Sequence, residues 1–133
     1  MSGSGDPFNL QRFVDAEAGG VFETALAELG TGRKRTHWMW FVFPQHRDLG
    51  RSPTAKHYGL SGGEEARAYA DHALLGPRLR QAARTVLAHL KAGEKAEAIL
   101  GPVDALKLRS SMEIFAESVP DEPLFREVLG AIH

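Results

Sequence analysis

The amino-acid sequence predicts an all-α fold, a compact single-domain bundle of about six helices around a central aromatic helix. One observation behind this prediction is that apolar residues recur every three or four positions along most of the chain. Another is that no two segments alternate apolar and polar residues as paired strands do. The length of 133 residues also suits one domain. We assign residues 1–8 to a flexible leader and residues 9–133 to the helical domain.

Two helices are expected ahead of the aromatic segment. Asn9 is suited to cap the first helix, whose apolar residues between positions 10 and 14 share one face. The second helix has the same apolar spacing over residues 22–29, and Gly30 and Gly32 end it.

The most unusual segment is the apolar run over residues 38–43, which reads Trp-Met-Trp-Phe-Val-Phe. Its composition suits either a buried strand or a helix. Thr36 offers a helix cap and Pro44 a terminator, so we expect a short central helix. At least two of the residues Trp38, Trp40 and Phe43 should lie deep in the core.

Four more helices are expected in the second half of the chain. Ser61 and Glu64 have the spacing of a capping box, which predicts the start of the first. The next has an apolar stripe over residues 79–90. Asp104 can cap the third, and the last helix covers the apolar positions between 125 and 132.

The composition excludes several classes of protein. The 16 basic and 17 acidic residues give a net charge of −1, so no global field favours a nucleic acid polymer or a membrane surface as partner. The chain has no cysteine, and its histidines do not recur at ligand spacing, so we expect no metal and no cofactor. No apolar run is long enough to span a bilayer, and the N-terminus lacks a signal-peptide pattern. We therefore expect a cytoplasmic monomer or small homo-oligomer.

Three groups of polar residues stand beside these apolar segments. Lys34, Arg35 and His37 precede the aromatic run, where free helix amides would favour an anion; a solvated basic loop is the alternative. The second group is Lys107, Arg109, Ser110 and Ser111. Serines are poor residues for a helix middle, so these allow either a close helix contact or a hydrogen bond to a ligand.

The third group consists of Glu65, Tyr69 and His72, which fall on one helical face. A carboxylate, a phenol and an imidazole can serve acid–base chemistry, or they can form a hydrogen-bonded surface row. Gln45 and Arg78 are further donors that could reach the same cleft.

The run Lys34 to Gln45, with the sequence KRTHWMWFVFPQ, resembles the signature of a bacterial family known as domain of unknown function eighteen-ten, whose members are sometimes mislabelled calpastatin. The resemblance extends from Asn9 to Leu129. It implies a mainly α-helical fold and carries no established activity.

These residues lead to one functional hypothesis with two alternatives. We expect a small anionic metabolite, of which a nucleotide is an example, to bind in a cleft between the aromatic helix and the helix that contains residues 107–111. The candidate ligand-binding residues are Lys34, Arg35, His37, Trp40, Gln45, Arg78, Lys107, Arg109, Ser110 and Ser111. The candidates for catalysis are His37, Tyr69 and His72, and the sequence leaves open whether the protein is an enzyme. The alternatives are a non-catalytic protein-interaction module and a polar-cored scaffold.

Overall fold

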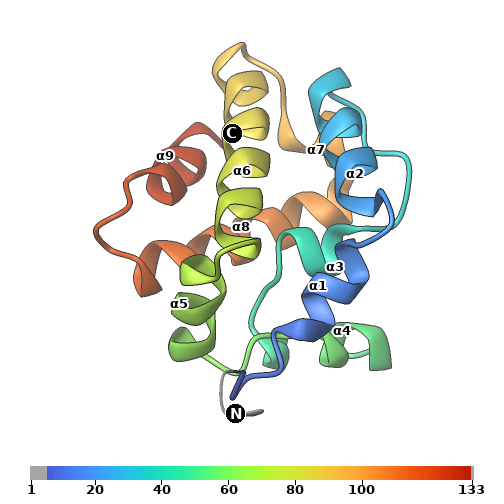
Figure 1. Ribbon diagram of the computed structural model, residues 1–133. Helices are drawn as coiled ribbons and strands as arrows, with labels where there is room; N and C mark the ends of the chain where they lie inside the picture. Colours follow the sequence, from blue (N-terminus) through green and yellow to red (C-terminus); the bar gives the residue numbers. More distant parts are fainter. Residues whose placement is uncertain (1–5, 133) are drawn as a thin grey trace.

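The computed structural model describes residues 6–132, and these form an all-α fold (Figure 1). Within this range the helices are α1 (Gln11–Glu17), α2 (Val21–Thr31), α3 (Met39–Val42), the 3-10 helix η2 (Arg47–Leu49), α4 (Pro53–His57), α5 (Gly63–Asp71), α6 (Leu75–Lys91), α7 (Ala96–Leu100), α8 (Pro102–Ser118) and α9 (Leu124–Ala131). The described residues contain no β-strand, only an isolated bridge between His46 and Leu60. The predicted fold class is confirmed. The sequence did not predict α4 and α7, which have five residues each, or η2, which has three, because such helices are too short for an apolar stripe.

The two longest helices, α6 and α8, have 17 residues each and hold the fold together. Helix α6 packs against α2, α5 and α9, and α8 packs against α5, α7 and α9. In Figure 1, α6 runs upright through the middle of the molecule and α8 crosses behind it. Helices α1, α2 and α3 lie to one side of this crossing, and α5 and α9 lie to the other.

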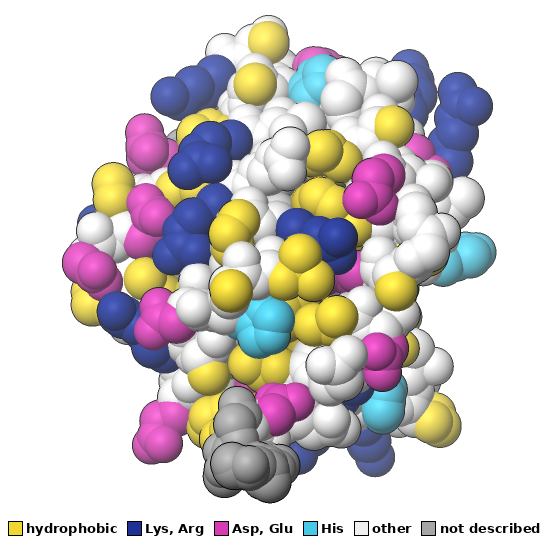
Figure 2. All heavy atoms as spheres, viewed as in Figure 1, with side chains coloured by type: hydrophobic (Ala, Val, Ile, Leu, Met, Phe, Trp, Pro, Cys, Tyr) yellow, Lys and Arg dark blue, Asp and Glu magenta, His cyan; other side chains and the backbone are white. Residues whose placement is uncertain are grey.

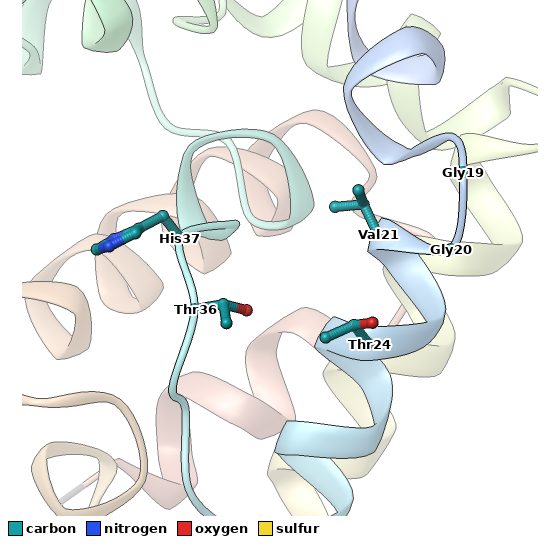
Figure 3. A pocket seen from close by; sticks show the side chains of 6 residues that line it. All are labelled: Gly19, Gly20, Val21, Thr24, Thr36 and His37. Carbon is teal, nitrogen blue, oxygen red and sulfur yellow. The ribbon is translucent and has the colours of Figure 1, made fainter.

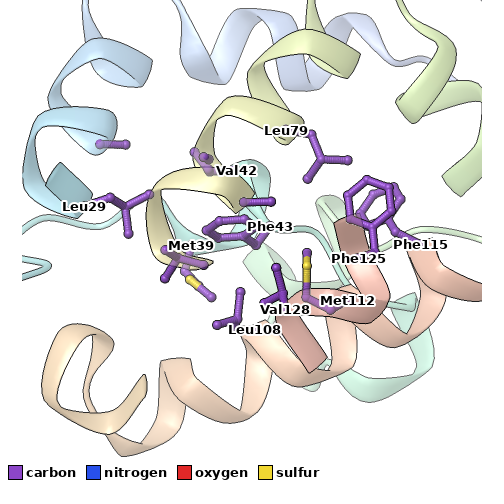
Figure 4. Close-up of a cluster of buried hydrophobic side chains, with 14 of the residues drawn as sticks. Leu29, Met39, Val42, Phe43, Leu79, Leu108, Met112, Phe115, Phe125 and Val128 are labelled. Atoms are coloured by element: carbon purple, nitrogen blue, oxygen red, sulfur yellow. The ribbon is translucent and has the colours of Figure 1, made fainter. Parts of the chain in front are cut away.

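One continuous core fills the space between these helices (Figure 4). Its side chains come from α2, α3, α6, α8 and α9 and include Leu29, Met39, Val42, Phe43, Leu79, Leu108, Met112, Phe115, Phe125 and Val128. Trp38 and Phe43 are each 1% exposed, as expected, whereas Trp40 is half-buried. The aromatic run therefore supplies the core from one face and leaves Trp40 at the edge.

The charged side chains on the face shown in Figure 2 are of both signs and are interspersed. Hydrophobic side chains gather near the middle of this face, around a cationic side chain. No broad patch of one sign appears there, in agreement with the net charge of −1.

The start of the domain differs from the prediction. Asn9 is not the cap of α1, because its backbone is in the left-handed region with φ of 54°. The carboxylate of Asp6 accepts hydrogen bonds from the amides of Leu10 at 2.6 Å and Gln11 at 3.0 Å instead. Phe8 packs against the core, so residues 6–8 are attached to the domain. The rest of the expected leader, residues 1–5, and the last residue of the domain lie outside the described residues.

Three further predicted caps were also wrong in position. Trp38 occupies the N-cap of the one-turn helix α3, and Thr36 does not cap it. Gly62 precedes α5, and Ser61 donates its amide and its hydroxyl to Glu65, not to Glu64, both at 2.9 Å. Helix α8 already begins at Pro102, so Asp104 lies inside its first turn. In each case the polar side chain is satisfied by a different partner than the local sequence indicated.

Candidate functional site

The basic loop before α3 is organised by a carboxylate that the sequence analysis did not single out. Glu28 accepts hydrogen bonds from the amides of Arg35 at 2.7 Å and Thr36 at 3.0 Å, from the Thr36 hydroxyl at 2.7 Å and from the Trp38 indole at 2.9 Å. Burial alone would raise the pKa of Glu28, but the hydrogen bonds from Arg35, Trp38 and Thr36 lower it to about 2. The predicted anion site at these amides is therefore already filled by the protein's own carboxylate.

A second carboxylate joins the two basic groups that the sequence analysis proposed. Asp104 lies 2.9 Å from the ammonium of Lys34 and 3.0 Å from that of Lys107. Burial raises the pKa of Asp104, but its contacts with Lys34 and Lys107 outweigh this and lower it below the ordinary value. The backbone amide of Lys34 also donates to the Ile99 carbonyl at 2.8 Å, which fixes the loop against α7. Lys34 and Lys107 are therefore close together, because both form ion pairs with Asp104.

Both lysines also contact a tryptophan. The Lys107 ammonium lies 3.7 Å from the centroid of the Trp40 ring, and the Lys34 ammonium lies 5.4 Å from that of Trp38. A cation over an indole face is an attractive arrangement, and it is stronger when water is partly excluded. Trp40 and Asp104 together therefore fix the position of the Lys107 ammonium.

A groove of about 510 Å³ opens beside this pair, between α3, the segment from η2 to α4, and α8. Its lining includes Trp40, Gln45, Leu49, Arg51, Val103, Leu106, Lys107 and Ser110. Of the four large hydrophobic side chains that are exposed among the described residues, three line this groove: Leu49 at 56%, Val103 at 64% and Leu106 at 68%. The groove therefore combines an exposed apolar wall with a fixed cation.

Four of the ten predicted ligand-binding residues line this groove, namely Trp40, Gln45, Lys107 and Ser110. The exposed side chains of Arg35 and Arg109 are not part of its lining. Ser111 is fully buried, and its hydroxyl has no hydrogen-bond partner among the described residues. The structure therefore brings only some of the predicted residues together in one cleft.

His37 belongs to a different and smaller hollow. This hollow, of about 250 Å³, lies between residues 19–24 and the loop that contains Thr36 (Figure 3). The Thr36 side chain points toward Thr24, whereas the His37 side chain points away from it. His37 is exposed and is not part of the groove lining.

The remaining predicted residues surround a buried glutamate. Tyr69 is fully buried and donates its hydroxyl to the Phe41 carbonyl at 2.7 Å; the same oxygen lies 3.2 Å from Glu17. Arg78 reaches the other oxygen of Glu17 at 3.4 Å and stacks on the ring of Phe22. Burial raises the pKa of Glu17 to about 7, although Tyr69 and Arg78 act in the opposite direction. Burial likewise raises the pKa of Tyr69 well above its ordinary value.

The predicted row of Glu65, Tyr69 and His72 is not one site. Glu65 forms an ion pair with Arg12 at 2.8 Å, whereas Tyr69 faces Glu17. The Nδ1 atom of His72 accepts hydrogen bonds from the amides of Leu74 and Leu75 and so supports the start of α6. These contacts are structural ones between helices.

Sequence reasoning missed Glu17 and Glu28, although a signal for both was present. Positions 10, 13, 14 and 17 continue one helical face, and so do positions 22, 25, 28 and 29. An acid on the apolar face of a helix must be buried or must interrupt the core. Both are buried, with exposures of 1% for Glu17 and 9% for Glu28.

Two features of the described residues bear on metals and membranes. Residues 6–132 contain no group of three or more histidine or acidic side chains placed to hold a metal ion. None of the helices in this range has the length and apolar character needed to cross a bilayer.

Comparisons with known proteins identify the family. The family model described as "Protein of unknown function (DUF1810)" matches residues 7–133. The chain is similar to the crystal structure of the conserved hypothetical protein Rv1873 from Mycobacterium tuberculosis, with 50% sequence identity and a TM-score of 0.91. That match covers 96% of this chain and 89% of the other. No curated protein matches the sequence. Since the family model spans nearly the whole chain, the protein belongs to this family of unknown function, as the resemblance of its sequence predicted.

Proposed function

We propose that the protein binds a small anionic ligand with an apolar part, such as a nucleotide, in the groove between α3 and α8. The observation that carries this proposal is the position of the Lys107 ammonium, 3.7 Å over the Trp40 ring at the side of an open, apolar-walled groove. A structural ion pair with Asp104 does not require this placement beside an exposed apolar surface.

The charge at the groove favours an anion. Lys34 and Lys107 carry two positive charges and Asp104 carries one negative charge, so this cluster has a net charge of +1. Arg51 adds a second positive charge at the rim and has no ion-pair partner among the described residues. No carboxylate lines the groove to repel a ligand. A phosphate or carboxylate group would therefore be attracted to Lys107 and Arg51.

The rest of the lining favours a ligand with an apolar part. Leu49, Val103 and Leu106 leave more than half of their surfaces exposed, which is unfavourable in water unless a partner covers them. Gln45 and Ser110 add an amide and a hydroxyl that can orient a polar edge. The lining contains no carboxylate, imidazole or phenol, so we propose binding and not catalysis.

The test is a titration of the protein with adenosine monophosphate, followed by isothermal calorimetry and by the shift in melting temperature. A ligand that binds only the folded state must raise the melting temperature. We expect Lys107→Met to weaken binding about tenfold or more. Arg109→Met on the same helix removes the same charge outside the groove and should leave binding unchanged. Equal losses in both variants would show that only net charge matters and would overturn the proposal.

A protein-interaction module is the second candidate, because the exposure of Leu49, Val103 and Leu106 also suits a partner's apolar side chains. A panel of phosphorylated and carboxylated metabolites separates the two candidates. If no member of the panel raises the melting temperature, the small-ligand proposal is wrong and the interaction module becomes the better account of this groove.

A further inference from the structure

A third hollow, a cavity of about 330 Å³, lies between the N-terminal segment and the turn that follows α4. The side chains that matter in its lining are Asn9, Arg12, Arg47, Lys56, His57 and Glu65. It shares no lining residue with the groove between α3 and α8. This cavity is mainly polar, so its ligand must differ from one that needs an apolar wall.

Arg12 and Glu65 form an ion pair in the lining of the cavity, and the N–H groups of the Arg12 guanidinium already donate to acceptors within the protein. Arg12 donates from Nε to the His57 carbonyl at 2.7 Å, from Nη1 to the carbonyls of Phe8 and Asn9, and from Nη2 to the Gly59 carbonyl and to Glu65. The second oxygen of Glu65 accepts the two hydrogen bonds from Ser61. Arg12 and Glu65 therefore balance each other and hold the shape of the cavity.

The side chains of Arg47 and Lys56 also line the cavity, and within residues 6–132 no carboxylate forms an ion pair with either of them. Arg47 and Lys56 are exposed, and within residues 6–132 neither side chain has a hydrogen bond or an ion pair. The imidazole of His57 has no hydrogen bond in this range either; it lies edge-on to the Tyr58 ring, with centroids 4.6 Å apart. Two cations on one cavity repel each other, and within residues 6–132 no hydrogen bond or ion pair of their charged groups offsets that repulsion.

The backbone holds these three residues close together. The amide of Arg47 donates to the Leu60 carbonyl at 2.8 Å, and the amide of Leu60 donates to the Gln45 carbonyl at 2.9 Å. Gly59 lies so close to Arg47 that a Cβ atom on it would be 2.3 Å from the Arg47 Cα. Arg47 and the turn at residues 56–59 are therefore fixed side by side, although eight residues lie between Arg47 and Lys56 in the sequence.

We infer that this cavity is a second binding site and that it takes a phosphate group, either as free phosphate or on a phosphorylated small molecule. The guanidinium of Arg47 offers a fork of donors, the ammonium of Lys56 offers a second charge, and the ring of His57 offers an N–H. Together these suit a group with several anionic oxygens better than a single carboxylate. The inference is independent of the proposed function of the groove, because the two sites have no lining residue in common.

The experiment titrates the uniformly ¹⁵N-labelled full chain with inorganic phosphate and, in a separate arm, with O-phosphoserine. Amide shifts at residues 47 and 56–61 report on the cavity. The double variant Arg47→Gln/Lys56→Gln should weaken binding about tenfold or more in both arms. The matched control is Arg84→Gln/Lys95→Gln, which changes two exposed cations elsewhere by the same charge. Since all four positions are exposed, both doubles should keep the wild-type melting temperature.

The outcomes are distinct. Tighter binding of O-phosphoserine than of phosphate would identify a phosphorylated molecule as the ligand, and the reverse would identify free phosphate; either result supports the site. If the shifts are absent in both arms, or if both double variants weaken binding equally, the inference is wrong. Lys107→Met should change neither arm, so a failure here can be told apart from a failure of the groove proposal.

Discussion

The indole Nε1 of Trp38 donates a 2.9 Å hydrogen bond to the carboxylate of Glu28, and this bond links the core to the basic loop. Trp38 is 1% exposed, so its N–H has no access to water and needs an internal acceptor. The same carboxylate also accepts the amides of Arg35 and Thr36. The backbone of this loop is therefore arranged around an internal anion, and the loop is part of the fold.

Replacement of Glu28 by alanine should lower the free energy of unfolding by about 3 kcal/mol or more, because several donors lose a charged acceptor at once. Because the pKa of Glu28 falls from 4.5 in the unfolded chain to about 2, its contribution is fully present above about pH 4.5 and is lost as the pH falls through about 2. Urea denaturation measures both effects. Glu23→Ala, an exposed change on the same helix, should shift the free energy by only about 0.5 kcal/mol, and equal losses would contradict this role.

The sequence predicted the fold well because apolar spacing determines which face of each helix is buried. The stripes over residues 79–90 and 125–132 correspond to α6 and α9, and the aromatic run is in the core as expected. The site was harder to predict, because its partners come from distant positions. Nothing near Lys34 in the sequence indicates that Asp104 will neutralise it, 70 residues away. The caps failed for a different reason, because nearby carboxylates compete for the same side chains: the Thr36 hydroxyl donates to Glu28, and the Ser61 hydroxyl donates to Glu65.

Glu17 should make the protein less stable as the pH rises. Its pKa is about 7 in the folded state and 4.5 in the unfolded chain, so between these values the folded state retains a proton that the unfolded state loses. The free energy of unfolding should fall by roughly 3 kcal/mol across this window from this group alone. Glu17→Gln should remove that fall, because an amide can donate to the Tyr69 oxygen as the protonated acid does.

The measurement for Glu17 is the difference between wild type and Glu17→Gln in urea midpoint, taken at about pH 5 and about pH 8. The difference should grow in favour of the variant at the higher pH. Asp15→Asn, which removes an exposed charge from the same helix as Glu17, serves as the control and should show no such growth. A difference that is the same at both pH values would mean that Glu17 is ionised throughout.

Gly76 should not tolerate a side chain. A Cβ atom at this position would lie 2.2 Å from the Ala70 carbonyl oxygen, which is backbone and cannot move aside without separating α5 from α6. Gly76→Ala should therefore cost about 2 kcal/mol or more, measured by chemical denaturation. Gly130 in α9 has open space at the same point, so Gly130→Ala should stabilise by about 0.5–1 kcal/mol. Opposite signs for these two substitutions are the expected result, and equal effects would contradict the packing described for Gly76.

Ser111 should be replaceable with a gain in stability. Its hydroxyl is fully buried and has no partner among the described residues, so removing it relieves an unsatisfied polar group. Ser111→Ala should raise the free energy of unfolding by about 1 kcal/mol. Ser110→Ala, one position away and half-buried, should give only the smaller gain of about 0.5 kcal/mol that helix propensity provides. A loss of stability in Ser111→Ala would show that this hydroxyl has a bonding role.

A substitution of Asp104 can distinguish what the cluster of Lys34, Lys107 and Asp104 contributes to folding from what it contributes to ligand binding. Asp104→Asn keeps the size of the side chain but removes the charge shared by Lys34 and Lys107, whose side chains are only 10% and 17% exposed. The free energy of unfolding should fall by about 2 kcal/mol. The net charge of the cluster rises from +1 to +2, so adenosine monophosphate should bind more tightly to the folded variant than to wild type. Calorimetry at a temperature where both proteins are folded measures this, with Asp15→Asn as the charge-matched control. Weaker or unchanged binding in Asp104→Asn would mean that the anion does not sit beside Lys107, and the groove proposal would fall with it.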